Sequence, residues 1–292
     1  MIDPSAWRAR GREIDACDGR VFVVELGSGE TPVLVLHGFP TSSWDFAEAA
    51  EIVAKDRRVV LFDFLGFGLS DKPHDMAYSL FEQADVATMV ARACGIRRAH
   101  LWAHDMGTSV TTELLARRER GLLPFEVASV TLMNGSVHLD MAHPTVGQRI
   151  LRTRLGPAFA RLTRKKLFIA QLERVFVKPP PNEVLEHMWE LLARCDGVLR
   201  TPSIIRYMDE RDTFVRRWIG ALERLDVPAL VAWAAKDPVA VLAIGEQLAS
   251  EIPGAEKVIW DDLGHYPQVE DPQRVAEAIR RFLARLDRGT VR

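Results

Sequence analysis

The 292-residue chain contains little cysteine, little tyrosine and little net charge. Its three cysteines, Cys17, Cys94 and Cys195, lie far apart in no CxxC or Cys/His spacing, which predicts inert buried thiols in a reducing compartment. The net charge of -2 gives no indication of nucleic-acid binding. No apolar run approaches the length of a membrane span, and the amino terminus is too polar for a signal peptide. We therefore expect a cytoplasmic protein with no transmembrane segment and no nucleic-acid partner.

Short apolar runs alternate with helical patterns over most of the chain. Two strands joined at 18–19 have a strong hairpin signal, and the runs at 32–36 and 58–62 have the composition of buried parallel strands. Helical spacing follows at 80–93, where Gly95 is expected to end the helix. This alternation predicts the α/β class, with a mostly parallel eight-stranded sheet flanked by helices.

The alternation stops between 136 and 224, where the patterns are helical. This block is inserted after a predicted strand, so it would cover the sheet edge at which sites gather. We predict a core of residues 1–135 and 225–292 with residues 136–224 as a helical lid. The segment from Arg152 to Lys178 carries eight basic residues and one acidic residue. A solvated helix face is the main interpretation, and binding to a membrane surface or a partner is the alternative.

The stretch from Leu101 to Thr108 places Asp105 between a predicted strand and a predicted helix. Small residues stand two positions before and after it, at Ala103 and Gly107, which is the spacing of a nucleophile elbow. Such a turn usually presents serine, and here it presents aspartate. A carboxylate is already ionised at pH 7, and its attack on a saturated carbon gives a stable alkyl ester. Aspartate therefore favours epoxides and alkyl halides over esters as substrates.

Two further residues follow predicted strands in the order acid, then histidine. Asp237 comes just after an apolar run, and His265 lies in the loop before the last helix. Asp105, Asp237 and His265 thus stand in the chain order of a hydrolase triad. We expect Asp237 to orient His265, which would remove a proton from the water that hydrolyses the ester. His37 and His104 are interpreted as structural.

The ordered set of HGFP at 37–40, AHDMG at 103–107, Asp237 and Gly264-His265 resembles the α/β-hydrolase superfamily over nearly the whole chain. Within it, the chain resembles the aspartate-nucleophile branch, which holds epoxide hydrolases and haloalkane dehalogenases. The resemblance implies an α/β-hydrolase fold with an inserted lid. It also implies that the backbone N–H groups of Phe39 and Met106 form an oxyanion hole. No metal site and no cofactor are expected.

The residues beside the nucleophile narrow the choice between a halide and an epoxide oxygen as the leaving group. Haloalkane dehalogenases typically hold the halide with side-chain N–H donors at the positions of Met106 and Phe39, and neither side chain donates a hydrogen bond here. Epoxide hydrolases use lid tyrosines as proton donors, and Tyr207 lies in the predicted lid. The sequence therefore favours an epoxide hydrolase that gives a diol. The alternatives are a haloalkane dehalogenase-like enzyme and a hydrolase-fold binding module without turnover.

An apolar substrate pocket is predicted next to the nucleophile. Its expected lining includes Trp44, Met133 and Trp189 beside Phe39 and Met106. Trp189 is also a candidate halide donor through its indole N–H. The expected partners are a small apolar substrate and water, and the sequence leaves a homodimer open.

Overall fold

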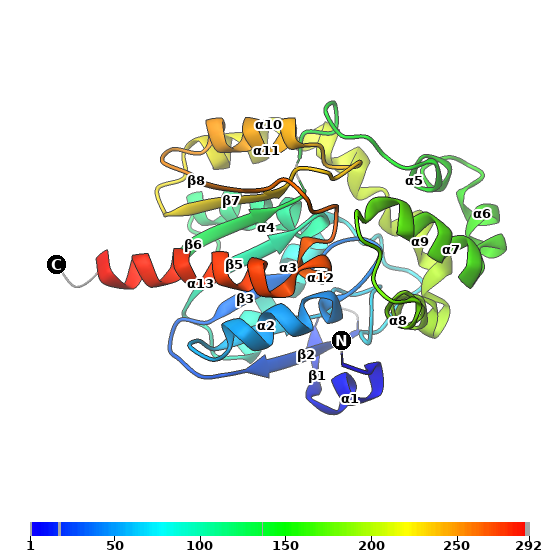
Figure 1. Cartoon of the computed structure of the whole chain (residues 1–292), viewed down its shortest axis with the longest axis horizontal. Helices are drawn as coiled ribbons and strands as arrows, with labels where there is room; N and C mark the ends of the chain where they lie inside the picture. Colours follow the sequence, from blue (N-terminus) through cyan, green and yellow to red (C-terminus); the bar gives the residue numbers. More distant parts are fainter. Residues whose placement is uncertain (1, 17–18, 136, 290–292) are drawn as a thin grey trace.

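The computed structural model, which describes residues 2–16, 19–135 and 137–289, is built on a mostly parallel eight-stranded sheet (Figure 1). The strands are β1 (Gly11–Ala16), β2 (Gly19–Leu26), β3 (Val33–Leu36), β4 (Val59–Phe62), β5 (Arg98–His104), β6 (Glu126–Met133), β7 (Ala229–Ala234) and β8 (Glu256–Trp260). They lie in the order β1-β2-β4-β3-β5-β6-β7-β8. β2 pairs antiparallel with β1 and β4, and the remaining pairs are parallel. The predicted fold class is confirmed.

Helices cover both faces of this sheet, and each face has its own apolar layer. The elements on one face are α1 (Pro4–Ala9), η1 (Ser43–Phe46), α2 (Ala47–Val53), α12 (Pro267–Glu270) and α13 (Pro272–Gly289). Those on the other are α3 (Leu80–Ala93), α4 (Met106–Glu119), α10 (Tyr207–Glu223) and α11 (Leu242–Glu251). No helix of the described residues has the length and apolar character needed to cross a membrane.

Local sequence signals explain where α3 begins and ends. The Ser79 hydroxyl accepts the Glu82 N–H, and the Glu82 carboxylate accepts the Ser79 N–H, which satisfies two backbone donors at the start of the helix. Gly95, with φ 65°, follows the last turn, as the sequence predicts.

The described residues between β6 and β7 contain helices and no strand. Besides α10, they form α5 (Val146–Leu151), α6 (Gly156–Leu162), α7 (Lys165–Leu172), η2 (Glu173–Val175), α8 (Asn182–Ala193), η3 (Arg194–Arg200) and α9 (Thr201–Ile204). Figure 1 shows α5 to α9 at one end of the molecule, opposite the carboxyl terminus, whereas α10 returns alongside the sheet. The division into a core and a lid stays a prediction.

The expectation of buried thiols is correct for Cys94 and wrong for Cys195, which is exposed. Cys195 lies at the kink where α8 meets η3, in a left-handed backbone conformation (φ 52°). The change of helix direction leaves its side chain at the surface. Cys17 lies outside the described residues.

A buried carboxylate joins α10 to the core helix α4. Glu113 of α4 accepts hydrogen bonds from Arg117 Nε (2.9 Å), Arg217 Nε (2.7 Å) and Trp218 Nε1 (2.9 Å). Burial alone would raise the pKa of Glu113, but these donors hold it below its ordinary value. The carboxylate is therefore charged at neutral pH and fully partnered.

We predict that Glu113→Ala lowers the free energy of unfolding by about 3 to 5 kcal/mol, because it leaves two arginines and the indole N–H of Trp218 without their shared acceptor. Urea unfolding followed by circular dichroism measures this loss. Glu119→Ala is the matched control, since Glu119 lies on the same helix as Glu113 but forms its ion pair, with Arg224, at the surface. Loss of this surface pair should cost about 0–1 kcal/mol. Equal losses in the two variants would contradict this role of Glu113.

Candidate active site

The turn from β5 into α4 brings Asp105 to the edge of the sheet. Its backbone has φ 46° and ψ -116°, a conformation that costs energy for any residue with a side chain. Neighbouring backbone packs closely against this turn. A Cβ at Gly107 would lie 2.1 Å from the Leu36 carbonyl oxygen, and one at Gly135 would lie 2.3 Å from the Asp105 Cα. Glycine at these two positions is therefore a steric requirement of the elbow.

The Asp105 carboxylate is only 5% exposed and is held from the loop after β3. The Phe39 backbone N–H donates to Asp105 Oδ2 at 2.8 Å. This is one of the two N–H groups expected in the oxyanion hole. Met106 is the first residue of α4, where a backbone N–H has no partner within the helix. Its contribution to the oxyanion hole stays a prediction.

His265 and Asp237 form a buried pair. His265 Nδ1 lies 2.7 Å from Asp237 Oδ2, and the other carboxylate oxygen accepts the backbone N–H groups of Val239 (2.7 Å) and Ala240 (3.0 Å). Asn134, which follows β6, donates to Asp237 Oδ2 at 2.9 Å. Sequence reasoning assigned no catalytic role to Asn134, although its position after a strand end is the signal that identifies such a residue. Here it fixes the carboxylate that faces the histidine.

The charges around His265 determine its protonation. Burial alone would lower the pKa of His265, but the Asp237 carboxylate and the nearby Asp105 outweigh burial and raise it above 6.5. Burial lowers the pKa of His104 to about 4, so His104 is neutral and its Nε2 can donate to the His265 carbonyl oxygen at 2.7 Å. His37 accepts the Phe64 N–H at 3.0 Å. Both additional histidines thus make hydrogen bonds that hold loops in place.

The sequence reasoning missed Arg211. This arginine of α10 is 4% exposed, donates from Nε to the Ser109 hydroxyl at 2.8 Å, and places Nη2 3.8 Å from Asp105 Oδ1. The two carboxylate oxygens of Asp105 therefore face different groups, a backbone N–H and a guanidinium. One signal was available, because Arg211 lies four residues after Tyr207 and so shares its helix face.

Tyr207 lies on the same side of the site. Its ring is 6.0 Å from the Phe39 ring, and the Arg211 guanidinium lies 4.6 Å above it. The hydroxyl is buried and has no hydrogen-bond partner among the described residues. Burial, and then the Asp105 carboxylate, raise the pKa of Tyr207 well above its ordinary value. The hydroxyl therefore stays protonated and keeps its donor available.

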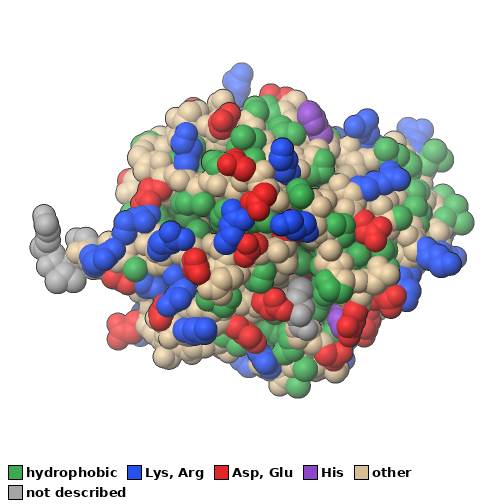
Figure 2. Space-filling model, in the orientation of Figure 1, with side chains coloured by type: hydrophobic (Ala, Val, Ile, Leu, Met, Phe, Trp, Pro, Cys, Tyr) green, Lys and Arg blue, Asp and Glu red, His purple; other side chains and the backbone are tan. Residues whose placement is uncertain are grey.

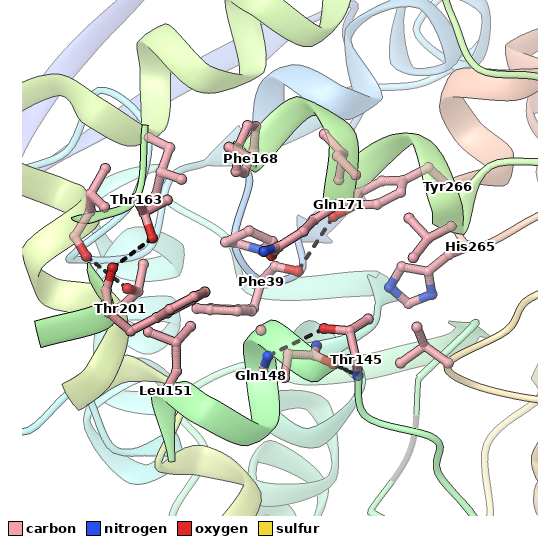
Figure 3. Close-up of a pocket in the computed structure, with 18 residues that line it drawn as sticks. Phe39, Thr145, Gln148, Leu151, Thr163, Phe168, Gln171, Thr201, His265 and Tyr266 are labelled. Atoms are coloured by element: carbon pink, nitrogen blue, oxygen red, sulfur yellow. Dashed lines mark hydrogen bonds between the residues drawn. The ribbon is translucent and has the colours of Figure 1, made fainter. Parts of the chain in front are cut away.

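A cavity of about 90 Å³ lies between Phe39, His265 and the helices that follow β6 (Figure 3). Its lining is mostly apolar, with polar groups from the inserted helices: Thr145, Gln148, Thr163, Gln171 and Thr201. Figure 3 shows Phe39 in the middle of this space, with His265 and Tyr266 on one side and Leu151 and Thr201 on the other. The cavity thus reaches His265 and Phe39, the residue whose N–H donates to Asp105.

Four residues predicted to line the pocket are not among those that line this cavity: Trp44, Met106, Met133 and Trp189. Trp44 is fully buried and its indole N–H donates to the Ile2 carbonyl, while Met133 accepts the indole N–H of Trp102. Both belong to the apolar layer packed on the sheet. Trp189 packs with its ring 5.5 Å from Phe168, which itself lines the cavity, so Trp189 lies one layer behind the surface. This position also places its indole outside the cavity lining.

The described residues contain no group of three His, Cys, Asp or Glu side chains arranged to hold a metal ion.

Comparisons with known proteins identify the family. The alpha/beta hydrolase fold family matches residues 31–272. The Mycobacterium tuberculosis protein LipZ is 42% identical over 95% of this chain and 98% of its own length. The Mus musculus mesoderm-specific transcript protein is 34% identical over 95% of this chain and 87% of its own length. The crystal structure of haloalkane dehalogenase DbeA from Bradyrhizobium elkani USDA94 superposes with a TM-score of 0.83 and 22% identity, covering 96% of this chain and 99% of that one, which shows the shared fold. The chain belongs to the alpha/beta hydrolase fold family.

Proposed function

We propose that the protein hydrolyses a small, largely apolar epoxide to a diol through an ester on Asp105. The observation that carries this proposal is the environment of the Asp105 carboxylate, with Oδ2 fixed by the Phe39 N–H and Oδ1 facing Arg211 and the Tyr207 side of the site. A carboxylate in this position attacks a saturated carbon. In this proposal residues 136–224 act as the lid that supplies the proton donor.

In the first step, Asp105 Oδ1 attacks a ring carbon of the epoxide and the carbon–oxygen bond of the ring breaks. The departing oxygen takes the electron pair of that bond and receives the proton of the Tyr207 hydroxyl. The product of this step is an alkyl ester on Asp105 with a neutral hydroxyl on the neighbouring carbon. The buried, protonated state of Tyr207 supports its assignment as the donor.

In the second step, His265 removes a proton from water, and the resulting hydroxide attacks the carboxyl carbon of the Asp105 ester. Negative charge then develops on Oδ2, where the Phe39 N–H already lies. Collapse of this intermediate expels the diol oxygen, which takes the proton of the imidazolium, and leaves Asp105 as a carboxylic acid. The remaining proton of the attacking water then passes from this acid to the Tyr207 phenolate, which restores both the carboxylate and the phenol. The pair with Asp237 stabilises His265 while it carries the proton.

A second candidate is hydrolytic dehalogenation, and one observation favours it. The Arg211 guanidinium lies beside Asp105 and is a cation that can offset the charge of a departing halide. Such a reaction would use the same ester and the same hydrolysis by His265. The two candidates differ in their need for Tyr207, because a halide leaves without a proton.

We predict that a single turnover in water labelled with heavy oxygen places the label in the peptide that contains Asp105. The attacking water adds its oxygen to the carboxyl carbon, and peptide mass analysis detects it. His265→Gln should accumulate the ester, seen as an added substrate mass on the same peptide. Asp105→Asn is the control that forms no ester. A label found only in the product would contradict the ester route.

We predict that Tyr207→Phe slows ester formation from styrene oxide by about 10²- to 10⁴-fold, the range that general acid catalysis contributes. Ester formation from a bromoalkane should change little, because bromide needs no proton. Rapid-quench mass analysis of the Asp105 peptide measures both rates. Tyr78→Phe, which removes the hydroxyl of another buried tyrosine, one that donates to the Pro73 carbonyl, is the matched control. Equal losses on both substrates would assign Tyr207 a packing role and favour the dehalogenase candidate.

We predict that hydrolysis of the ester accelerates as pH rises through the pKa of His265, since only the neutral imidazole accepts a proton. Asp237 raises this pKa, so Asp237→Asn should move the midpoint of the pH profile to lower pH. Decay of the ester formed in a single turnover by the chain with His265 intact, followed across pH 5 to 9, about the range in which histidine titrates, provides the measurement. An unchanged midpoint in Asp237→Asn would show that Asp237 is not the residue that sets the pKa.

A further inference from the structure

The helices that line the cavity also carry an unusual outer surface. All but one of the exposed large apolar side chains of the described residues lie between 146 and 214. The most exposed are Val146 at the start of α5, Leu155 next to α6 and Leu162 at the end of α6, with exposures of 68, 70 and 72%. Leu167 on α7 extends the group. Apolar side chains gathered in this way usually mark an interaction surface.

The same helices are basic. Arg154, Arg161, Arg164, Lys166 and Arg174 are exposed, and no ion pair is found for them among the described residues. Glu173 is the one acidic residue of the segment from Arg152 to Lys178. Figure 2 shows green and blue side chains together at the right-hand end of the molecule, where Figure 1 places α5, α6 and α7. We call this surface of α5 to α7 the lid face.

We propose that the lid face docks on the surface of an anionic lipid bilayer. Leucine and valine side chains gain by leaving water for the acyl boundary, and arginine and lysine side chains reach the anionic headgroups around them. Charge complementarity therefore selects an anionic surface over a neutral one. This proposal concerns location and does not depend on the reaction at Asp105.

Charge also argues against a second copy of this chain as the occupant. A two-fold contact through the lid face would place the same basic side chains against each other, with few acidic residues to balance them. A nucleic acid would satisfy the charge but would leave Leu155 and Leu162 without an apolar environment. A bilayer surface satisfies both parts of the lid face.

The docked position has a consequence for access to the cavity. Leu151, Phe159 and Phe168 belong to α5, α6 and α7 and line the cavity from inside. The outer surface of the same helices would rest on the lipid. An apolar substrate dissolved in the bilayer would therefore meet the helices that enclose the site before it meets any other part of the protein.

Co-sedimentation with lipid vesicles tests the proposal. The full chain should pellet with vesicles of phosphatidylcholine and phosphatidylserine and remain in the supernatant with phosphatidylcholine alone, and high salt should release it. The double variant Leu155→Ser/Leu162→Ser should lose at least about tenfold in affinity for anionic vesicles. Arg161→Glu/Lys166→Glu should also lose at least roughly tenfold, because each basic side chain near the surface contributes about fivefold.

Leu122→Ser and Arg120→Glu are the matched controls. Both residues follow the end of α4 that is remote from the elbow, and Leu122 is 67% exposed. These variants should bind like the unmodified chain. The proposal is overturned if the chain shows no preference for anionic vesicles, or if the lid-face variants bind as tightly as the controls. It is also overturned if light scattering finds a dimer that the Leu155→Ser/Leu162→Ser variant converts to a monomer.

Discussion

The buried negative charge of Asp105 is the constraint on which the rest of the site depends. A carboxylate that is 5% exposed requires partners, because burial without them costs several kcal/mol, on the order of 3 to 5 for a broken pair. The Phe39 N–H supplies one partner from the core, and Arg211 supplies a cation from α10. Since α10 belongs to the inserted block of residues 136–224, movement of that block away from the elbow would either expose the Asp105 carboxylate or leave it buried without its cation. Glu113 also holds α10 against α4, because Arg217 and Trp218 of α10 donate hydrogen bonds to its carboxylate.

The strand ends explain why the remaining groups converge. Parallel strands β6 and β7 are in register with Met133 opposite Ala232, so the residues that follow them, Asn134 and Asp237, reach the same edge. Asn134 donates to Asp237 and to the Ala234 carbonyl, and this ties the two loops together. His265 then meets a carboxylate whose position is fixed from three sides. The geometry of the histidine pair is thus a property of the sheet as much as of the two residues.

The sequence predicted the parts of the fold and site that depend on local signals. Apolar runs and the glycine spacing around Asp105 are local, and so is the order of acid and histidine along the chain. Arg211 was missed, because its contact with Asp105 joins residues 106 positions apart and depends on how α10 lies on α4. Its spacing from Tyr207 was the one local pointer to this contact. Trp44 and Met133, predicted as pocket residues, lie outside the lining of the described cavity for a related reason. Apolar composition near a motif does not distinguish a cavity wall from the packed layer behind it.

The pairing of Tyr207 with Arg211 makes the proposed ring opening more favourable as it proceeds. Before attack, burial and the Asp105 carboxylate both raise the pKa of Tyr207, while Arg211 lowers it. Formation of the ester removes the negative charge of Asp105, so one of the two effects that hold the proton on Tyr207 disappears. The Arg211 guanidinium, 4.6 Å above the tyrosine ring, remains and stabilises a phenolate. The phenol therefore becomes a stronger acid at the moment when the departing oxygen needs a proton, and the charge that first keeps the donor protonated is the charge that the reaction consumes.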